Sequence, residues 1–206
     1  MTAHLQRHRL TGMRIVAVCL LASALIPSLS RAQEAPVFAI STADSSIKFN
    51  VKASVAIGGT FDNWNATLTF TSPVVTTGVL DVEIQAASVD TGSGMKDSKL
   101  KGPDFFDAAN NPLISFKSTK LEQTGPNTFE VDGNFTIRGV TRQETLTLAV
   151  SGVGTGSGQI KGTLYFDRKD YGMNSGIPFI RIANRVEVNV DLKGNRVSGP
   201  PLVLKQ

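Results

Sequence analysis

The stretch Ser88–Gly94 is the part of the chain that most closely resembles a catalytic motif. Asp90, Thr91 and Gly92 follow an apolar residue, as in the catalytic loop of an aspartic protease. Such an enzyme needs two aspartates that share one proton, and the chain has no second Asp-Thr-Gly. Asp90 would need a symmetric dimer, and the residues after it are polar and would not exclude water. The sequence therefore favours a turn in which the Asp90 carboxylate accepts backbone N–H bonds.

The other candidate catalytic groups are also weak. Ser93–Lys96 match the Ser-x-x-Lys motif of acyl transfer, but no Lys-Thr-Gly follows. We interpret this match as chance. Two acid pairs have a spacing that would suit a general acid and base: Asp104 with Asp107, and Asp167 with Asp170. Such pairs are more often loop carboxylates or caps of short helices, and no Asp-x-Asp-x-Asp calcium spacing is present.

The first 32 residues have the pattern of a cleaved secretory signal peptide. Basic residues without any acid precede the apolar run Ile15–Ile26, and small residues stand at Ser30 and Ala32. The apolar run is too short to span a membrane, which takes about 20 residues. We therefore expect export, with residues 33–206 as the mature chain. The expected location is the periplasm, or the medium if the cell has no outer membrane.

Removal of this segment limits the chemistry that remains. Cys19, His4 and His8 are the only cysteine and histidines, and all three lie within it. The remaining chain cannot form a disulfide, a Ser-His-Asp triad or a histidine-ligated metal site. The four arginines of residues 1–32 account for the net charge of +4. Because residues 33–206 are neutral, the sequence gives no electrostatic reason to expect nucleic-acid binding.

Residues 33–206 alternate between apolar and polar side chains, with no comparable helical period. Clear examples are residues 47–52, 80–85 and 186–193. This period of two predicts half-buried antiparallel strands, about eight in number, in a single domain. One apolar face must be buried, so the sheet closes into a barrel or forms a two-sheet sandwich. The segment at about 90–112 is predicted to be a long loop or a short helix, and the glycine-rich run 151–158 to connect two strands.

All eleven phenylalanines lie after residue 33, most of them on the apolar faces. The interior of an eight-stranded barrel is either filled by side chains or holds one ligand. Phe105 and Phe106 differ from the others because they are adjacent in the long loop. Adjacent side chains of a strand point to opposite faces, so we expect at least one of the two to cover the mouth of the barrel.

Taken together, these segments resemble the YceI-like family of periplasmic lipid-binding proteins. The most specific match is Ser88–Ser118, with Ser-Val-Asp-Thr-Gly, Lys-Asp, Asp-Phe-Phe-Asp, a proline and Ile-x-Phe-x-Ser. Three more segments agree, in order along the chain: Ile47–Phe70, Gly133–Leu148, and FDRKDYGM with the closing VEVNVDL.

The resemblance implies a lipocalin-like, eight-stranded antiparallel barrel that holds a polyisoprenoid, such as an isoprenoid quinone or a polyprenyl chain. It implies no catalytic residue and no required cofactor. Many family members carry histidines where this chain has Ala53 and Lys99. The identity of the lipid head group is therefore open.

From the alternation and the resemblance we predict the side chains that contact the lipid. Those of the interior and mouth are Phe49, Val51, Phe70, Ile84, Phe105, Phe106, Phe116, Phe135 and Phe166. Lys96, Lys99 and Lys101 flank the entrance and would receive a phosphate or quinone head. The main alternative is a barrel with a solid core that acts as the partner of a membrane protein. A hydrolase ranks last, and hydrophobic residues at the mouth would allow a homodimer.

Overall fold

The structure is a computed structural model that describes residues 34–54, 57–176 and 179–204. The chain divides into two units, Met1–Ala32 and Gln33–Gln206, and every described residue belongs to the second. The predicted signal peptide therefore lies outside the described residues. Within the described ranges, no helix combines the length and the apolar character needed to cross a lipid bilayer.

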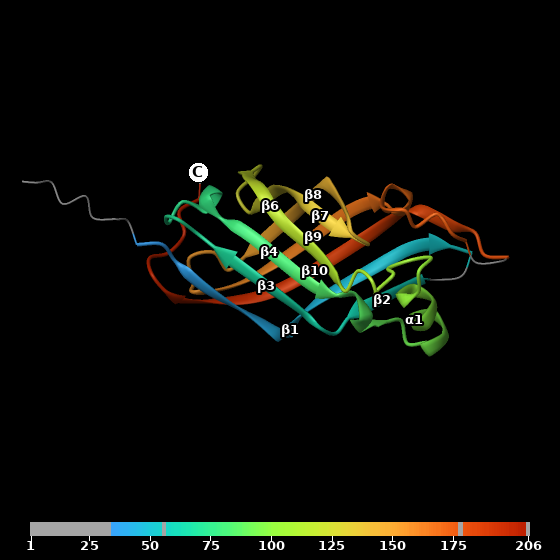
Figure 1. Cartoon of the computed structure of the whole chain (residues 1–206). Helices are drawn as coiled ribbons and strands as arrows, with labels where there is room; N and C mark the ends of the chain where they lie inside the picture. The colour runs from blue at the N-terminus through green and yellow to red at the C-terminus, as the bar shows by residue number, and fades with distance from the viewer. Residues whose placement is uncertain (1–33, 55–56, 177–178, 205–206) are drawn as a thin grey trace, which may run out of the picture. The chain divides into compact units, whose positions relative to one another are not determined.

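The second unit consists of one antiparallel sheet with a few short helices (Figure 1). The strands are β1 (Val37–Ala53), β2 (Ile57–Phe61), β3 (Trp64–Thr69), β4 (Val79–Gln85), β5 (Val89–Asp90), β6 (Leu113–Gln123), β7 (Thr128–Ile137), β8 (Val140–Ser151), β9 (Ser157–Asp167) and β10 (Ile182–Ser198). The α-helix is α1 (Gly94–Lys101), and the 3-10 helices are η1 (Val75–Thr77), η2 (Ala86–Ser88) and η3 (Arg168–Tyr171).

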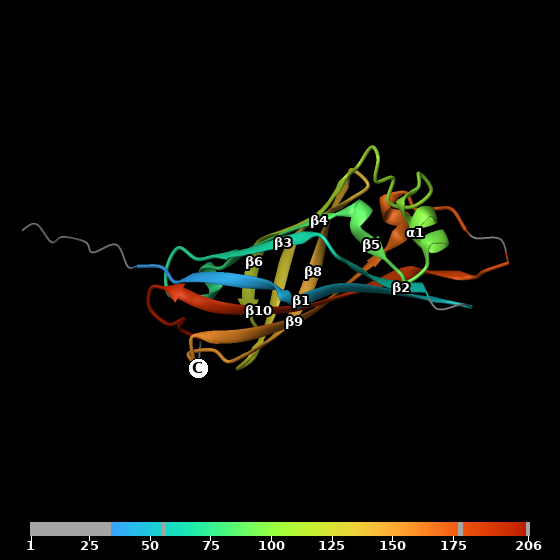
Figure 2. The ribbon, with the colours of Figure 1, turned by 90° about the horizontal axis from the view of Figure 1, so that it is seen from below.

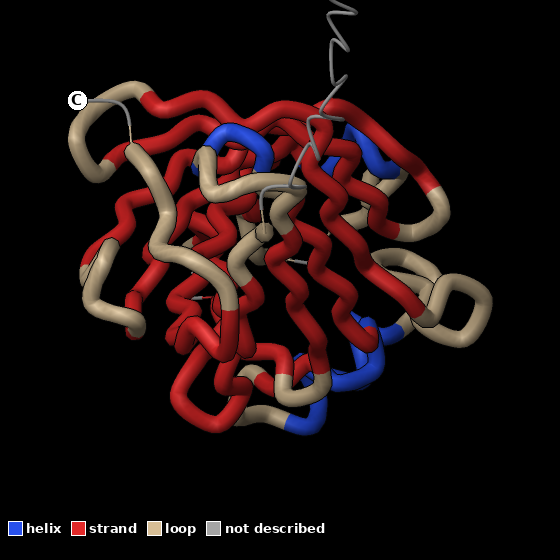
Figure 3. The backbone as a smooth tube through the Cα atoms, turned by 90° about the vertical axis from the view of Figure 1, so that its left-hand side faces the viewer, coloured by secondary structure: helices blue, strands red, loops and turns tan. Residues whose placement is uncertain are grey.

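The sheet order is β3-β4-β6-β7-β8-β9-β10-β1-β2-β5, and each pairing between neighbours is antiparallel. The first strand thus lies beside the last, and the sheet curls around a common interior (Figures 2 and 3). This architecture confirms the predicted all-β, lipocalin-like class. The predicted loop or short helix at about 90–112 is also confirmed, because it contains α1.

The structure has ten strands where the sequence suggested about eight. The segment Ile57–Thr69 forms two strands, because Asp62 and Asn63 interrupt it: the apolar residues stand at odd positions in β2 and at even positions in β3. The additional strand β5 has only two residues and pairs with the end of β2 through Thr60↔Asp90 and Phe61↔Val89. A two-residue strand carries no periodicity, so the pattern of side chains cannot reveal it.

The apolar face of each strand points inward, as the alternation requires. In β7, for example, Phe129, Val131, Phe135 and Ile137 are buried, whereas Glu130 and Asn134 between them are exposed. The buried side chains of the strands join those of the 100–108 segment in one core cluster. The interior of the sheet is therefore almost entirely hydrocarbon.

The glycine-rich run 151–158 connects β8 and β9, which confirms its predicted role. Gly152, Gly154 and Gly156 have φ values of +76°, +86° and +88°. L-residues rarely adopt this region of φ, so the turn depends on glycine. At Gly152, a Cβ atom would also lie 2.4 Å from the carbonyl oxygen of Ser157.

Gly133 provides the space into which the Phe116 ring packs across the β6–β7 pair. A Cβ atom at this position would lie 2.5 Å from Cζ of Phe116 and 2.8 Å from the carbonyl oxygen of Lys117. We expect Gly133→Ala to lower the free energy of unfolding by about 1–3 kcal/mol, because the buried ring must leave its position. Urea unfolding measures this change.

Gly94→Ala is the matched control, because a Cβ atom on Gly94 meets nothing within 4 Å. Gly94 is the first residue of α1, where alanine is a better helix former than glycine. Equal stability losses in the two variants would contradict the steric explanation for Gly133.

Candidate functional site

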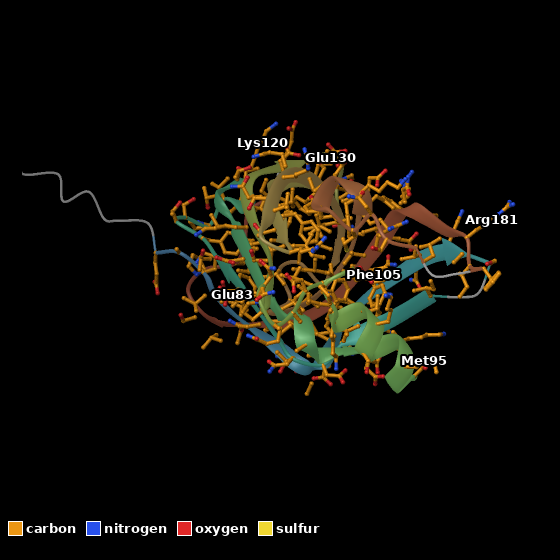
Figure 4. All side chains as sticks on the ribbon, turned by 45° about the vertical axis from the view of Figure 1, so that its right-hand side comes forward. Glu83, Met95, Phe105, Lys120, Glu130 and Arg181 are labelled. Carbon is orange, nitrogen blue, oxygen red and sulfur yellow. The ribbon has the colours of Figure 1, made fainter. Side chains whose placement is uncertain are left out.

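An apolar cavity of about 400 Å³ lies inside the barrel, at the end that carries α1. Its wall exposes only apolar atoms. Figure 4 shows this end from the side, with Phe105 inside the fold and Met95 on its surface. The lining residues are Phe49, Val51, Ile57, Phe61, Ile84, Met95, Lys96, Lys99, Leu100, Phe105, Phe106, Ile114, Phe135, Ile137, Phe166, Arg168, Met173, Ile180, Ile182, Val186 and Val188.

Most of the wall comes from inward-facing positions of strands that neighbour each other in the sheet. Val51 of β1 lies opposite Val186 of β10, Val186 lies opposite Phe166 of β9, and all three line the cavity. β-branched and aromatic side chains suit such strands because they pack well on a pleated surface. The strand pattern visible in the sequence therefore accounts for this part of the wall.

The loop that follows α1 supplies two aromatic rings to the cavity. Phe105 and Phe106 are both buried and both line it. The ring of Phe106 lies 5.9 Å from that of Phe61 and 6.3 Å from that of Phe49. Both rings point inward because residues 102–107 form tight turns, in which Phe106 N donates to Leu100 O and Asp107 has a φ of +49°.

Asp90 is the last residue of β5, and its carboxylate holds the turn that follows, as the sequence predicted. Its Oδ1 atom accepts a hydrogen bond of 2.7 Å from the Gly92 amide, and Gly92 has a φ of +72°. Asp97 of α1 holds the same turn, because its Oδ1 accepts from the Thr91 amide at 2.8 Å and from Thr91 Oγ1 at 2.7 Å. Both aspartates thus have structural partners in the loop that begins α1.

The hydrogen bonds from Thr91 lower the pKa of the Asp97 carboxyl group below its usual value of 3.8. A group with a lowered folded pKa stabilises the fold above its unfolded pKa, and this contribution is lost as the pH falls through the folded pKa. We expect Asp97→Asn to melt below the wild type near pH 6, and this difference to shrink as the pH falls below about 4.

Circular dichroism melts across the pH series measure this difference. The positive charge of Lys101 also lowers the pKa of Asp97, by less than the hydrogen bonds from Thr91 do. A melting difference that stays constant down to about pH 2 would show that the carboxylate charge plays no part.

The opposite side of the mouth is formed by the segment after β9. Arg168 is buried, and its guanidinium donates to the carbonyl oxygens of Met173, Ser175 and Ala183. These bonds turn the nitrogens toward the backbone, so only the carbon part of Arg168 faces the cavity wall. Met173 and the half-buried Ile180 and Ile182 complete this side.

An aromatic cluster packs at the start of the segment that follows β9. The rings of Phe135, Phe166 and Tyr171 lie 5.2–5.5 Å apart, and the Tyr171 hydroxyl donates to Oε1 of Glu144 at 2.7 Å. Burial is the main cause that raises the pKa of Tyr171, and the Glu144 carboxylate adds to it. The hydroxyl therefore stays protonated and keeps its donor role.

Sequence reasoning did not single out Arg168, Met173, Ile180 and Ile182. Arg168 belongs to the segment FDRKDYGM, but an arginine in a loop gives no sign that it is buried. Ile182 is the first residue of β10 and has the same alternation phase as Val186 and Val188. Continuing the apolar alternation four residues back from Val186 would have identified it.

Of the side chains predicted to contact a lipid, Phe49, Val51, Ile84, Phe105, Phe106, Phe135 and Phe166 line this cavity. Phe70 and Phe116 do not. Phe116 is buried against Gly133 and lines neither of the two apolar cavities in the described part of the barrel. Phe70 lines the second cavity, where its ring packs 5.7 Å from that of Phe38.

Only two of the three lysines predicted to receive a lipid head group line the cavity. Lys96 and Lys99 line the cavity at its mouth, and Lys101 does not. Lys99 Nζ forms an ion pair of 2.5 Å with Asp104, which also accepts from Ser175 Oγ at 3.0 Å. The hydrogen bond from Lys99 is the main cause that lowers the pKa of Asp104. The hydrogen bond from Ser175 to Asp104 joins the loop after α1 to the segment after β9.

The second apolar cavity is smaller, about 90 Å³, and lies toward the other end of the strands. It is lined by Phe38, Phe129 and Leu148 among others, and by Leu202 and Leu204 near the C-terminus. Val203 holds this C-terminal segment in place, because its amide donates to Pro73 O at 2.8 Å and its carbonyl accepts from Val75 N at 3.2 Å.

Comparison with known proteins places the fold among solved structures. Residues 38–194 match the model of the YceI-like domain. The crystal structure of Burkholderia cenocepacia BcnA aligns with a TM-score of 0.68 and 25% identity, over 75% of this chain and 99% of that one. A polyisoprenoid binding domain from Saccharophagus degradans aligns with a TM-score of 0.62 and 16% identity, over 78% of this chain and 99% of that domain, and shows the shared fold.

Curated relatives match a shorter part of the sequence. The protein YceI of Escherichia coli O17:K52:H18 is 32% identical over 96 residues, which is 47% of this chain and 50% of that protein. A UPF0312 protein of Pseudomonas savastanoi pv. phaseolicola is 33% identical over 98 residues, 48% of this chain and 51% of that protein. The chain thus spans about half the length of the curated relatives it matches. Because the family model covers most of the chain, the protein belongs to the YceI-like domain family.

Proposed function

We propose that this protein is a periplasmic lipid-binding protein that holds a polyisoprenoid chain in the barrel interior, as a carrier or a sequestering protein. The cavity of about 400 Å³ is the observation that carries the proposal. Its size lies within the range of about 300–1,000 Å³ found for small-molecule sites. A wall of apolar atoms with an open end suits a flexible hydrocarbon chain better than a polar metabolite.

The energetics of such a guest are favourable. Each methylene removed from water contributes about 0.8 kcal/mol, so one isoprene unit of five carbons contributes roughly 3–4 kcal/mol. Four units contribute roughly 12–16 kcal/mol, which offsets an association cost of about 4–8 kcal/mol and leaves the roughly 8 kcal/mol of micromolar affinity. Tight binding therefore requires few polar contacts.

The comparisons support a ligand of this class. The Saccharophagus degradans neighbour is described as a polyisoprenoid binding domain, and it shares the fold over 78% of this chain. The proposal includes export to the periplasm, which the basic and apolar pattern of residues 1–32 supports. It assigns the protein a binding role rather than a catalytic one.

The main alternative was a barrel with a solid core that serves as the partner of a membrane protein. The presence of a cavity argues against a solid core. Lipid extraction separates the two functions directly. The protein is purified without detergent from its own cell envelope, extracted with organic solvent and analysed by mass spectrometry.

We expect an isoprenoid lipid to copurify in a ratio of about one per chain, and the emptied protein to bind added polyprenol or quinone. An extract without lipid, together with no uptake of either compound, would overturn the proposal. Unrelated fatty acids alone in the extract would contradict the isoprenoid class while leaving a lipid-binding function in place.

A further inference from the structure

The ends of β1 and β10 that meet near α1 project past the other strands of the sheet (Figures 1 and 2). Two hydrogen bonds hold them together there: Ser54 N donates to Arg181 O at 3.0 Å, and Arg181 N donates to Ser54 Oγ at 3.2 Å. This projecting part, residues 51–54 and 179–186, is called here the tip. The tip stands at the mouth of the apolar cavity, because Ile180 lines that cavity.

The tip carries the most exposed large apolar side chain among the described residues. Phe179 is fully exposed, and Met95 of α1, the next most exposed at 84%, lies at the same end of the barrel. Figure 4 shows Met95 and Arg181 on the outer surface of this end. Scattered apolar residues are normal on a protein surface. Two such side chains beside one cavity mouth instead indicate a surface that another apolar phase covers.

The segment that leads into β10 has two distinct sides. Ile180 and Ile182 line the cavity, whereas Phe179 and Arg181 are exposed. The two isoleucines belong to the apolar wall, but no contact inside the barrel involves the outer side of this segment. A contact outside the protein gives a physical reason for an aromatic ring there, because the ring would then leave water.

The tip is also basic. Its exposed charged side chains are Lys52, Arg181 and Arg185. The tip contains no acidic residue, and among the described residues no ion pair within 4.0 Å includes any of these three cations. The adjacent Glu187 is half-buried, and its Oε1 accepts a hydrogen bond of 2.7 Å from Asn189.

An apolar ring surrounded by long basic side chains suits the surface of an anionic bilayer. The ring enters the boundary between head groups and acyl chains, while the Lys and Arg side chains extend to the phosphates. Each such cation is attracted to an anionic membrane surface. A stable protein interface, by contrast, needs about 800 Å² on each partner, and the tip offers two strand ends with one exposed ring.

We propose that the tip, together with Met95, docks this protein on a membrane surface that contains anionic phospholipid. Phe179 and Met95 enter the bilayer, and Lys52, Arg181 and Arg185 contact the phosphates. This docking uses side chains on the outside of the barrel, so it does not depend on what the cavity holds. It would place the mouth of the cavity against the membrane.

The orientation is tested with a tryptophan at each end of the barrel. Phe179→Trp should shift its fluorescence emission to shorter wavelength when vesicles of equal parts phosphatidylglycerol and phosphatidylcholine are added, because the indole leaves water. Val197→Trp is the matched control, because Val197 is also exposed but lies near the other end of β10. Its emission should not shift. The native Trp64 is present in both variants and gives the same background.

Vesicle sedimentation measures the strength of docking. Phe179→Ser should weaken binding about tenfold or more, the effect of removing one buried aromatic side chain, whereas Val197→Ser should bind as the wild type does. Met95 is left unchanged because it also lines the cavity.

The charge contribution is tested with a double variant. Lys52→Gln with Arg181→Gln should also weaken binding about tenfold or more, because each cation near an anionic surface contributes about fivefold. The matched control is Lys161→Gln with Lys193→Gln, which removes the same charge from exposed positions of β9 and β10 outside the tip. Wild-type binding should weaken as salt is added and on vesicles of phosphatidylcholine alone.

Several results would overturn the docking surface. These are a wild type that does not bind the anionic vesicles, an unshifted emission of bound Phe179→Trp, and equal losses in the tip variants and their controls. A wild-type dimer that Phe179→Ser dissociates, without vesicle binding, would assign the ring to a second copy of the chain. Uptake of geranylgeraniol from solution is measured separately, so its failure would overturn the proposed function and not the docking surface.

Discussion

Val188→Trp is expected to weaken isoprenoid binding at least about 100-fold, because the indole fills the space that the tail would occupy. Val188 is half-buried and lines the cavity from β10, opposite Phe49 of β1. Displacing three or four methylenes from the cavity removes about 3 kcal/mol of binding free energy, since each contributes about 0.8 kcal/mol. Titration of the emptied variant with geranylgeraniol measures the loss.

Val197→Trp is the matched control, because Val197 lies on the same strand but is 67% exposed and outside the cavity. It should bind the alcohol as the wild type does. Because a bulky residue can also disturb folding, the melting temperature of each variant is measured first. Ile180→Trp, at the less buried mouth, provides a second way to block the site. Unchanged affinity in folded Val188→Trp and Ile180→Trp would place the ligand elsewhere.

Arg168→Met is expected to lower the free energy of unfolding by about 3 kcal/mol. Only 6% of Arg168 is exposed, and its guanidinium satisfies the carbonyls of Met173, Ser175 and Ala183. Methionine fills much of the space but leaves these carbonyls without their donor, and each unsatisfied buried group costs about 1–3 kcal/mol. Water can reach part of this segment and replace some of the lost hydrogen bonds. The expected loss of unfolding free energy therefore lies near the lower end of the summed cost of the three carbonyl groups.

Lys169→Met tests whether the effect belongs to the buried position. Lys169 is the exposed neighbour of Arg168, and surface substitutions of this kind change stability by less than about 0.5 kcal/mol. Arg168→Lys should not restore the wild-type value, because one ammonium cannot reproduce the planar fork of the guanidinium. Urea unfolding at neutral pH gives the three values. A loss in Arg168→Met no larger than in Lys169→Met would contradict the clamp role of Arg168.

Val188 and Arg168 contribute to different properties of the same end of the barrel. Val188 concerns the space available to a ligand, and Arg168 concerns the segment that forms one side of the mouth. Arg168 holds Met173, which lines the cavity. Arg168→Met should also lower ligand affinity, because the segment at the mouth is less firmly held. The loss should be smaller than in Val188→Trp, because the apolar wall on the strands remains intact.

The sequence by itself determined the features that depend on neighbouring residues. The period of two established the all-β class and the inward face of each strand, as in β7 and β10. Asp90 formed a turn because an aspartate before Thr-Gly can accept a nearby amide. Phe105 and Phe106 turned inward because two adjacent rings in a polar loop have a strong hydrophobic reason to leave water.

The tertiary structure decided how far along the barrel each inward side chain lies. Phe116 and Phe135 are register partners on the same face, yet only Phe135 reaches the cavity. Alternation gives the face of a side chain but not its depth, which depends on strand order, register and the curvature of the sheet. Phe70, beyond the end of β3, lies at the second cavity for the same reason.

The burial of Arg168 and the grouping of side chains on the outer face of the sheet likewise arise only from the folded chain. One groove on this outer face combines side chains from β1, α1, β9 and β10, and its residues lie between positions 50 and 187 of the sequence. Nothing in a local pattern distinguishes Arg185 from any other exposed arginine on a strand. The pairing of the first strand with the last places Lys52 beside it, and this long-range pairing is the physical step that local sequence patterns do not encode.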